Sequence, residues 1–403
     1  MTILIAILVF GLLIFIHELG HYLTARLFDV HILEFALGMG PKLLSYKSKK
    51  TGIVYSLRLL PFGGYVSMVG EDDEGLLDED GNPLSQGGAG SFSVPAPKGY
   101  GDEDEPSQPP VTYRDPRALS AKPVWQRMII TAAGATMNLL LGVVLSLILV
   151  FTMEPIGGTV VGKFADNALS AEQGLQVGDV ITQVNGDRIR THMELAYAIS
   201  HDGFEPVEIT VIRGAQLNTR QVTLEDGSIG TYVVSYTGGK ELVLKEVSFG
   251  TMEEEGIVMG YQDFSPRAEA KTFSNVMAQT FGYTRLAVRQ VIDGVVDLVT
   301  GRFGMEQMSG PVGVTQQVSK AAAMGIEQFL FLVLVITVNL GVFNLLPIPA
   351  LDGGRLFFQL IELIFRKPIP QKWEGRIHLI GLALLLLLMV VITGQDIIRI
   401  FAK

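Results

Sequence analysis

Two histidines and a glutamate lie close together near the start of the chain, in the H-E-L-G-H sequence of residues 17–21. On a helix, His17 and His21 project from one face and can reach a single metal ion, with Glu18 placed to act on a metal-bound water. This spacing is typical of zinc peptidases. Residues 1–16 contain no charged side chain. The motif therefore predicts a hydrolase inside a lipid bilayer. The alternative is a chance arrangement in an apolar helix, which the cost of ionisable groups at membrane depth argues against.

A candidate third ligand, Asp352, lies at the end of an apolar segment that two prolines and two glycines interrupt between residues 347 and 354. These residues break a helix and put Asp352 on irregular backbone, which is tolerated at membrane depth only where protein or water covers it. Asp352 could then bend toward His17 and His21. Two histidines and one aspartate leave the fourth zinc position open, as catalytic sites require. Alternatively, Asp352 caps the helix that follows.

Membrane-spanning helices are expected to position these residues. About 20 apolar residues cross the ~30 Å of hydrocarbon in a bilayer. Four segments qualify: residues 1–25, 124–153, 327–352 and 376–394. The mean hydropathy of +0.36 agrees with spans plus a domain folded outside the membrane. The first segment could instead be a signal peptide, but it lacks a basic start and a small-residue cleavage site.

Charge is unevenly distributed along the 403 residues. Residues 71–110 contain eleven acidic residues and one lysine, which accounts for the whole net charge of −10. Because this part is rich in Gly, Pro and Ser, we expect a loosely ordered, acidic cytoplasmic loop over residues 71–123; an acidic partner site is the alternative. Nothing indicates nucleic-acid binding. The chain has no cysteine, so zinc must be bound by His, Asp or Glu.

Basic residues near the spans predict the orientation of the chain. They cluster between the first two spans and in the short loop between the last two. Since cytoplasmic loops carry an excess of Lys and Arg, both loops are expected in the cytoplasm. The two termini and the region between the second and third spans then lie outside the cytoplasm, with the active site toward the cytoplasmic side.

Residues 26–70 have the composition of strands rather than of a helix. Ile53–Leu60 is rich in strand-forming residues, and turn clusters flank it at Ala36–Pro41 and Pro61–Val66. We expect a membrane-associated β-hairpin or sheet that lines a cavity next to the metal. Its free edge could pair with an extended substrate, or it could be an ordinary juxtamembrane sheet.

Small residues open the second span, from Thr131 to Asn138. They would let this helix approach the first one closely, and Asn138 needs a hydrogen-bond partner in lipid. Packing alone explains the small residues. A cavity-lining role for Asn138 is a further hypothesis.

The region between the second and third spans has two parts. Residues 157–245 have the short strands and turns of a β-rich domain, and Gly174–Gly186 resembles the G-L-x-x-G-D-x-I-x-x-x-N-G pattern of PDZ domains. That resemblance implies binding of peptide ends by strand addition, with residues 191–200 as the groove helix. The domain could also act only as a size filter. Over residues 265–305 the apolar spacing predicts an amphipathic helix, which lies on the membrane, clamps the domain or packs against it.

Three motifs together resemble the site-2 protease family of intramembrane zinc metalloproteases. They are the H-E-L-G-H sequence, the Gly134–Asn138 pattern and the N-x-x-P-x-P-x-L-D-G sequence from Asn344 to Gly353. The resemblance covers nearly the whole chain, including the Phe62–Tyr65 turn and Ser309–Gly313. It is closest to the bacterial subgroup that has one extracytoplasmic PDZ domain, although the acidic insert is longer than expected of that subgroup.

The resemblance implies a protease of the bacterial cell membrane. Its substrates would be single-span proteins already shortened by another protease, including anti-sigma factors and remnant signal peptides. One Zn²⁺ would be held by His17, His21 and Asp352, with Glu18 as general base and then general acid. Candidate contacts to substrate or transition state are Asn344, Pro347, Asn138, Gly63 and Gly64, with Asn344 near the developing oxyanion.

Two other classes of function are compatible with parts of the sequence. A non-hydrolytic membrane scaffold would bind peptides through the PDZ-like domain and keep the metal for structure. A metal transporter would also place His and Asp in spans, but the sequence contains no second set of intramembrane ligands along a pathway.

Overall fold

The computed structural model describes residues 2–71, 76–77, 113–223, 228–254, 257–302, 308–367, 369 and 371–402. The chain forms two compact units. The first contains Met1–Leu141, Ser309–Lys320 and Ile336–Lys403, and the second contains Gly142–Met308 and Ala321–Val335. Most of the predicted acidic loop lies outside the described residues.

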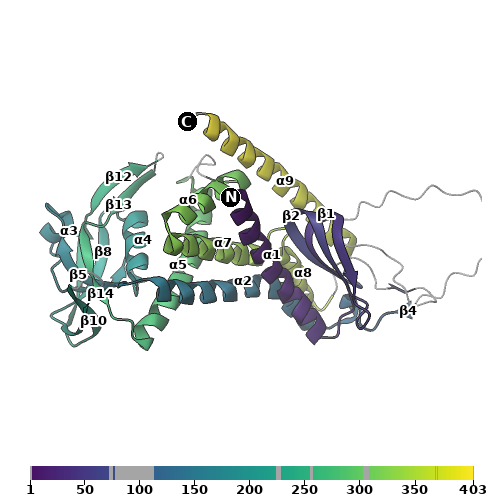
Figure 1. Cartoon of the computed structure of the whole chain (residues 1–403), viewed down its shortest axis with the longest axis horizontal. Helices are drawn as coiled ribbons and strands as arrows, with labels where there is room; N and C mark the ends of the chain where they lie inside the picture. Colours follow the sequence, from purple (N-terminus) through teal and green to yellow (C-terminus); the bar gives the residue numbers. More distant parts are fainter. Residues whose placement is uncertain are drawn as a thin grey trace, which may run out of the picture. The chain divides into compact units, whose positions relative to one another are not determined.

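Four of the described helices are long and apolar enough to cross a membrane (Figure 1). They are α1 (Thr2–Leu27), α2 (Val124–Thr152), α7 (Ile326–Leu345) and α9 (Gln371–Ala402). This agrees with the four spans expected from the sequence. The interruption expected near the end of the third one is present, because α7 stops at Leu345. A loop follows, and Asp352 begins the separate helix α8 (Asp352–Phe365).

In the first unit, a small sheet packs against α1. Strands β1 (Ile32–Lys47) and β2 (Val54–Met68) are antiparallel and strongly bent, and β2 contacts α1. The predicted turn at Ala36–Pro41 lies inside β1, which passes through it with Gly38 and Gly40 at positive φ. Buried apolar side chains of this sheet, including Phe35 and Val66, form a core with Ala25 of α1 and Ile130 of α2. The two strands lie within the β region expected over residues 26–70, although residues 26 and 27 still belong to α1.

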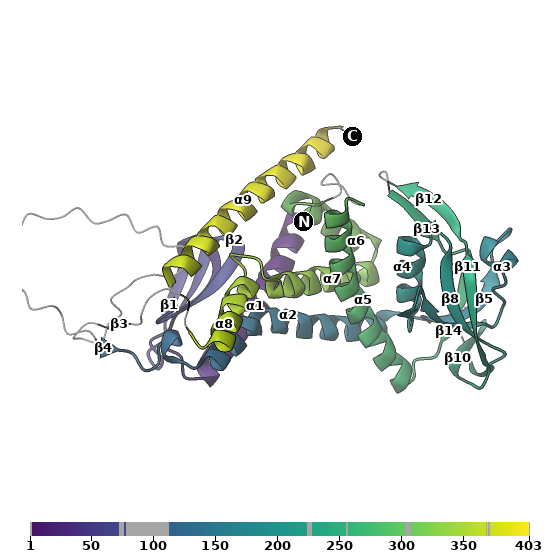
Figure 2. The ribbon, with the colours of Figure 1, turned by 180° about the vertical axis from the view of Figure 1, so that it is seen from behind.

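The second unit contains a mainly antiparallel sheet in the order β11-β8-β6-β5-β14-β10-β9. Its members are β5 (Ile156–Phe164), β6 (Val180–Val184), β7 (Asp187–Arg188), β8 (Val207–Arg213), β9 (Gln216–Thr223), β10 (Ile229–Thr237), β11 (Lys240–Val247) and β14 (Phe264–Glu269). Figure 2 shows α4 (His192–Asp202) beside the sheet. Buried Leu195 and Ile199 of α4 join Val161, Ile181 and Ile209 in the core.

The boundaries of this β-rich region differ from those expected. Because β14 pairs with β5, the sheet extends beyond residue 245. Residues 265–269 belong to this strand and not to the start of the amphipathic helix. That helix is α5 (Phe273–Thr300). The shorter elements are α3 (Leu169–Glu172), β3 (Leu76–Leu77), β4 (Tyr113–Arg114), η1 (Leu119–Ala121), β12 (Gly250–Glu254), β13 (Ile257–Tyr261) and α6 (Pro311–Met324).

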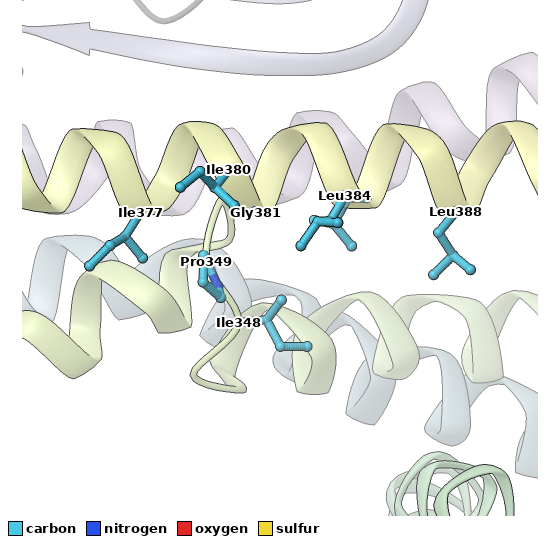
Figure 3. Close-up of a pocket in the computed structure, with 8 residues that line it drawn as sticks. Ile348, Pro349, Ile377, Ile380, Gly381, Leu384 and Leu388 are labelled. Carbon is cyan, nitrogen blue, oxygen red and sulfur yellow. The ribbon is translucent and has the colours of Figure 1, made fainter.

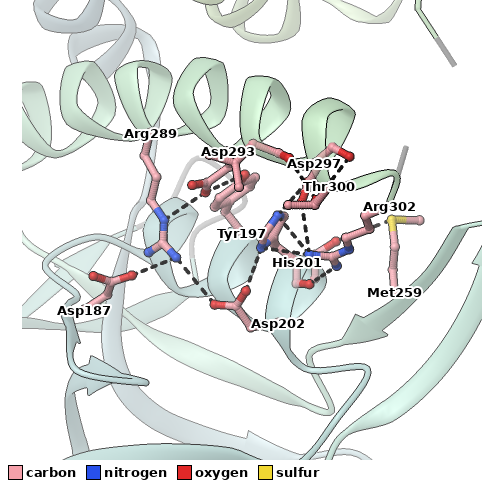
Figure 4. A network of polar contacts seen from close by, with 12 residues as sticks. Asp187, Tyr197, His201, Asp202, Met259, Arg289, Asp293, Asp297, Thr300 and Arg302 are labelled. Carbon is pink, nitrogen blue, oxygen red and sulfur yellow. Dashed lines mark hydrogen bonds and ion pairs between the residues drawn. The ribbon is translucent and has the colours of Figure 1, made fainter. Parts of the chain in front are cut away.

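A polar network joins α5 to α4 (Figure 4). The Tyr197 hydroxyl donates to Asp293 Oδ2 at 3.0 Å. The His201 ring contacts Asp202 Oδ1 through Nδ1 at 2.6 Å and Asp297 Oδ2 through Nε2 at 2.9 Å. These hydrogen bonds to Asp202 and Asp297 raise the pKa of His201. Of the alternatives for the amphipathic helix, packing against the domain is therefore observed.

Candidate active site

The structure brings together three residues that the sequence nominates as metal ligands. His17 Nε2 lies 3.3 Å from His21 Nε2 and 3.2 Å from Asp352 Oδ2. His21 Nε2 lies 3.3 Å from the same carboxylate oxygen. All three residues belong to the first unit. Among the described residues, this is the group of His, Asp and Glu side chains with the spacing of a metal site.

The spacing of these three atoms fits a zinc ion. A tetrahedral zinc bound at ~2.0–2.1 Å separates its ligand atoms by about 3.3–3.4 Å, close to the observed distances. Asp352 Oδ2 is buried, and among the described residues it accepts no hydrogen bond of good geometry. A buried carboxylate oxygen in this state needs a cation as its partner. Three protein ligands leave one tetrahedral position for water or substrate.

Gly134 of α2 provides the space beside the imidazoles. A Cβ atom at this position would lie 2.3 Å from His21 Nε2 and 2.8 Å from His17 Nε2. Any larger residue would therefore fill the space next to the Nε2 atoms of both histidines. The small residues of the second span thus allow close approach, as expected, and Gly134 approaches the imidazole rings themselves.

The other ring nitrogen of each histidine faces α2. His21 Nδ1 lies 2.8 Å from the Ile130 carbonyl oxygen, which fixes the ring and points Nε2 toward the cluster. His17 Nδ1 lies 3.2 Å from Asn138 Nδ2. Asn138 is fully buried. It therefore lies next to the Nδ1 side of the His17 ring.

A tightly folded loop sets the position of Asp352. After α7 ends, Ile348 N donates to Leu346 O at 2.7 Å, and the chain returns over the start of α8. Gly353 makes this fold possible, because a Cβ there would lie 2.0 Å from Leu346 O. The expectation that Asp352 itself is on irregular backbone is wrong, since Asp352 is the first residue of α8. The irregular part is the loop before it.

Contacts from two other helices hold α8 and this loop. On α8, Gln359 Nε2 donates to Thr131 Oγ1 at 3.0 Å, and Glu362 accepts from Arg127 Nη2 at 2.7 Å. Both partners are on α2, which also faces the two histidines. On the other side, Ala350 N donates to His378 Nδ1 of α9 at 2.9 Å. Asp352 is thus placed by a helix with anchors on the same element that positions His17 and His21.

The same loop has an apolar surface on its α9 side. Ile348 and Pro349 line a groove of about 330 Å³ with Ile377, Gly381 and Leu384 (Figure 3). All of its lining residues are apolar or glycine. The loop therefore has its apolar residues on the α9 side and leads directly to Asp352.

Glu18 lies beside the edge of the small sheet. Its side chain is 8% exposed and within electrostatic reach of His17 and His21. A Cβ at Gly64 of β2 would lie 2.9 Å from Glu18 Cγ. Only glycine at this position lets the strand run so close to the carboxylate.

The remaining predicted site residues are less closely tied to the cluster. Asn344 is in the last turn of α7, where its amide nitrogen donates to Leu340 O at 2.9 Å. Pro347 is exposed in the loop. Gly63 has a positive φ of 73° and lies against Met39. Roles of these residues in substrate binding stay predictions.

The sequence interpretation did not single out Asp396, which anchors the far part of α9. Its Oδ2 accepts from Gly313 N at 2.8 Å, at the start of α6, and its side chain is buried. A carboxylate stabilises the exposed N–H groups of a helix N-terminus. In the sequence, the feature that could have identified Asp396 is its position as an acidic residue next to an apolar span. This contact also gives a structural reason for the Ser309–Gly313 sequence.

Comparisons with known proteins give the family. The sequence model of peptidase family M50 matches residues 5–388. The zinc metalloprotease RasP of Bacillus licheniformis is 32% identical, and the match covers 99% of both chains. The regulator of sigma-W protease RasP of Bacillus subtilis is also 32% identical over 99% of both chains. A putative zinc metalloprotease of Clostridium perfringens has the same identity and coverage. With this agreement over nearly its whole length, the chain belongs to peptidase family M50 and is an intramembrane zinc metalloprotease.

Proposed function

We propose that His17, His21 and Asp352 bind the catalytic zinc and that Glu18 is the general base of peptide hydrolysis. The observation that carries this proposal is the near-equilateral arrangement of two imidazole nitrogens and one carboxylate oxygen at 3.2–3.3 Å. These atoms come from opposite ends of the sequence. The scaffold alternative is not favoured, because the matched relatives are named as proteases.

Each residue of the site then has a distinct task. When bound, zinc lowers the pKa of a water toward about 7 and polarises the carbonyl of the scissile bond. Glu18 takes the proton of the attacking water and later delivers it to the leaving amine. Its nearly complete burial strengthens its interaction with charges that develop nearby. His17, His21 and Asp352 orient the reaction by fixing one face of the site and leaving the other open.

We propose single-span membrane proteins as the substrates, including anti-sigma factors or remnant signal peptides. The name of the Bacillus subtilis relative, a regulator of sigma-W protease, supports this class. A second support is the β2 strand, which passes beside Glu18 at Gly64. An extended substrate added to this sheet would present its backbone near the general base, whereas a helical peptide bond is shielded.

The orientation in the bacterial cell membrane follows from the distribution of basic residues. The loops between the first two and the last two spans are cytoplasmic in this proposal, and the β-rich domain of the second unit is extracytoplasmic. The PDZ-like sequence of that domain supports two roles. It binds peptide ends of shortened substrates, or it excludes substrates with bulky outer domains.

The first test replaces the general base. Glu18→Gln keeps the side-chain volume but removes the basic carboxylate, so cleavage of a model single-span substrate should fall by at least about 100-fold, the lower range for general-base catalysis. Zinc content, measured by elemental analysis, should stay at one ion per chain. Mass spectrometry of membrane fragments that accumulate in cells with this variant would identify substrates.

Glu327→Gln at the start of α7 is the matched control and should cleave at the parent rate. Wild-type turnover by Glu18→Gln would remove Glu18 from the mechanism. His17→Ala and Asp352→Ala test the ligands separately, because each should lose zinc. If Asp352→Ala held zinc as tightly as the parent, the proposed ligand set would be wrong.

A further inference from the structure

The two metal-binding histidines have the same requirement at their second ring nitrogen. In a neutral imidazole, one nitrogen carries a proton and the other has the lone pair that a metal needs. The 3.2–3.3 Å cluster uses Nε2 of both His17 and His21. Each Nδ1 must therefore carry the proton and donate it to an acceptor. A ligand histidine without this partner is poorly fixed and binds its metal less tightly.

For His21 this acceptor is a backbone group. Its Nδ1 lies 2.8 Å from the carbonyl oxygen of Ile130, and no side-chain substitution can remove that oxygen. For His17 the neighbour is the side-chain amide of Asn138, with a distance of 3.2 Å between His17 Nδ1 and Asn138 Nδ2. The two histidines thus depend on α2 in different ways.

The same amide group of Asn138 also contains an acceptor that no described residue uses, the oxygen Oδ1. Among the described residues, Asn138 Oδ1 is buried without a hydrogen-bond partner, and the residue is 0% exposed. A half-turn about the last side-chain torsion exchanges Oδ1 and Nδ2, which have nearly the same size. After this exchange the oxygen faces His17 Nδ1, so the proton of the ligand tautomer gains its acceptor and the oxygen its donor.

We propose that Asn138 is a positioning residue whose side-chain oxygen accepts a hydrogen bond from His17 Nδ1–H and holds His17 in the metal-binding tautomer. This inference rests on the proposed zinc ligands. It replaces the idea that Asn138 lines the substrate cavity. Asn138 is two turns after Ile130 on α2, so one helix supplies the acceptors of both histidines. An amide does this without adding a second buried negative charge at membrane depth.

Two substitutions distinguish whether Asn138 acts as a hydrogen-bond acceptor or only as a packing residue. Asn138→Leu keeps the branched shape of the side chain, with larger end groups, but has no acceptor, so the zinc dissociation constant should rise about 10–100-fold, the usual effect of losing a partner of a ligand histidine. Asn138→Asp keeps an oxygen acceptor, so zinc should bind at least as tightly as in the parent. Both constants are measured on the full chain in detergent by competition with a chromophoric chelator.

A spectroscopic measurement reports the geometry of the metal ligands independently of the affinity. With Co²⁺ in place of zinc, the visible absorption bands report the geometry of the ligands. They should shift in Asn138→Leu and stay close to those of the parent in Asn138→Asp. Ser146→Ala is the matched control, since Ser146 is also a fully buried polar residue of α2 and hydrogen-bonds to Thr284 at 3.0 Å. It should leave the affinity and the spectrum unchanged.

Two results would overturn the inference. One is parent-like zinc affinity in Asn138→Leu, and the other is an equal loss in the Leu and Asp variants, which would make the amide nitrogen the important atom. If Asn138→Leu does not fold, Asn138→Ala removes the same acceptor with a smaller side chain and replaces it in the comparison. Failure of the zinc site itself is recognised separately, because then Asp352→Ala would also retain its metal.

Discussion

At the scale of single residues, the space around the proposed metal ligands depends on a position of α2 that has no side chain. Gly134 has no side chain where a methyl group would touch both imidazoles. Asn138, one turn later, reaches the back of His17. On one helix, Gly134 thus leaves space beside the Nε2 atoms of the two histidines, and Asn138 contacts Nδ1 of His17.

Substituting this glycine gives the prediction at this scale. In Gly134→Ala, the new methyl group would lie 2.3 Å from His21 Nε2, so the imidazoles must move apart and zinc binding should be lost. The helix itself should be more stable by about 1 kcal/mol, because alanine is the better helix former. Elemental analysis should find less than one-tenth of the parent zinc content, while the melting temperature without metal stays the same or rises.

Gly11→Ala on α1 is the control for this substitution, since a Cβ there meets nothing within 4 Å. It should keep both zinc and activity. Full zinc content in Gly134→Ala would contradict the view that this glycine is needed for the site.

The sequence predicts the identity of the chemical groups well at this scale. The spacing of His17 and His21 is a local helical property, and the glycines and prolines around Asp352 identify an interrupted helix. The contact between Gly134 and the imidazoles is different. It depends on where α1 and α2 cross, and no local pattern specifies a crossing point. Sequence analysis therefore predicts small residues for close packing but not the group that they approach.

At the scale of elements, α8 begins with Asp352, the proposed third ligand, and α2 contacts and supports α8. The Arg127–Glu362 ion pair joins their surfaces at 2.7 Å, with both side chains less than one-fifth exposed. Gln359 adds a hydrogen bond to Thr131 on the same face. Because Asp352 is at the start of α8, movement of this helix moves the ligand.

Breaking the ion pair should therefore weaken the metal site as well as the fold. Glu362→Gln leaves Arg127 without its charged partner in a mostly buried place, which should cost roughly 1–3 kcal/mol of stability. Zinc affinity should fall several-fold because Asp352 is held less firmly. Arg127→Met with Glu362→Gln removes both charges and should recover most of the stability. Chemical denaturation and chelator competition measure the two quantities in a double-mutant cycle. Additive effects of the two substitutions would contradict direct coupling.

The ends of elements are where sequence and structure differ most. The third span was expected to break between residues 347 and 354, and α7 stops at Leu345, just before this stretch. The physical reason is Pro347, which disfavours helical backbone at the residue before it. The β-rich region was expected to end at residue 245, but β14 returns to pair with β5 about a hundred residues earlier in the chain. Such pairing is not visible in local alternation of residues.

At the scale of the whole molecule, the proposed metal ligands come from both ends of the sequence. His17 and Asp352 enclose the complete second unit between them in the chain. The number of spans and the general separation into a membrane part and a β-rich part could be predicted from hydropathy. The convergence of the ligands could only be hypothesised, because it depends on contacts between residues that are far apart in sequence.

A mostly buried acid, Glu269, predicts that the stability of the second unit depends on pH. Glu269 ends β14, and its Oε2 accepts a long hydrogen bond of 3.4 Å from Gln279 on α5. Burial raises the pKa of Glu269 from 4.5 to about 7, although the hydrogen bond from Gln279 opposes this. The folded state thus favours the protonated acid. This stabilisation is fully present below pH 4.5 and is lost as the pH rises through about 7, by ~3 kcal/mol at most.

Glu269→Gln should remove this dependence, because the amide cannot ionise. Between pH 5 and pH 8 the unfolding free energy of the parent should fall relative to that of the variant, with the variant more stable at pH 8. Thermal unfolding of the full chain in detergent measures the difference. The exposed Glu241→Gln is the control and should follow the parent at both pH values. Parallel curves for the parent and Glu269→Gln would show that Glu269 ionises as easily in the folded state as in the unfolded one.

The chain segments that precede and follow the acidic insert lie next to each other on the first unit. Leu119 N donates to Val69 O at 2.8 Å, His31 N donates to Arg117 O at 2.9 Å, and β3 pairs with β4. Since the free energy of closing a loop changes only slowly with its length, residues between these anchor points can be added or removed at little cost to the fold. The stability of the fold therefore constrains the length of this stretch only weakly. In the laboratory it offers a location for an affinity tag or a fluorescent reporter, spliced in far from both ends of the polypeptide.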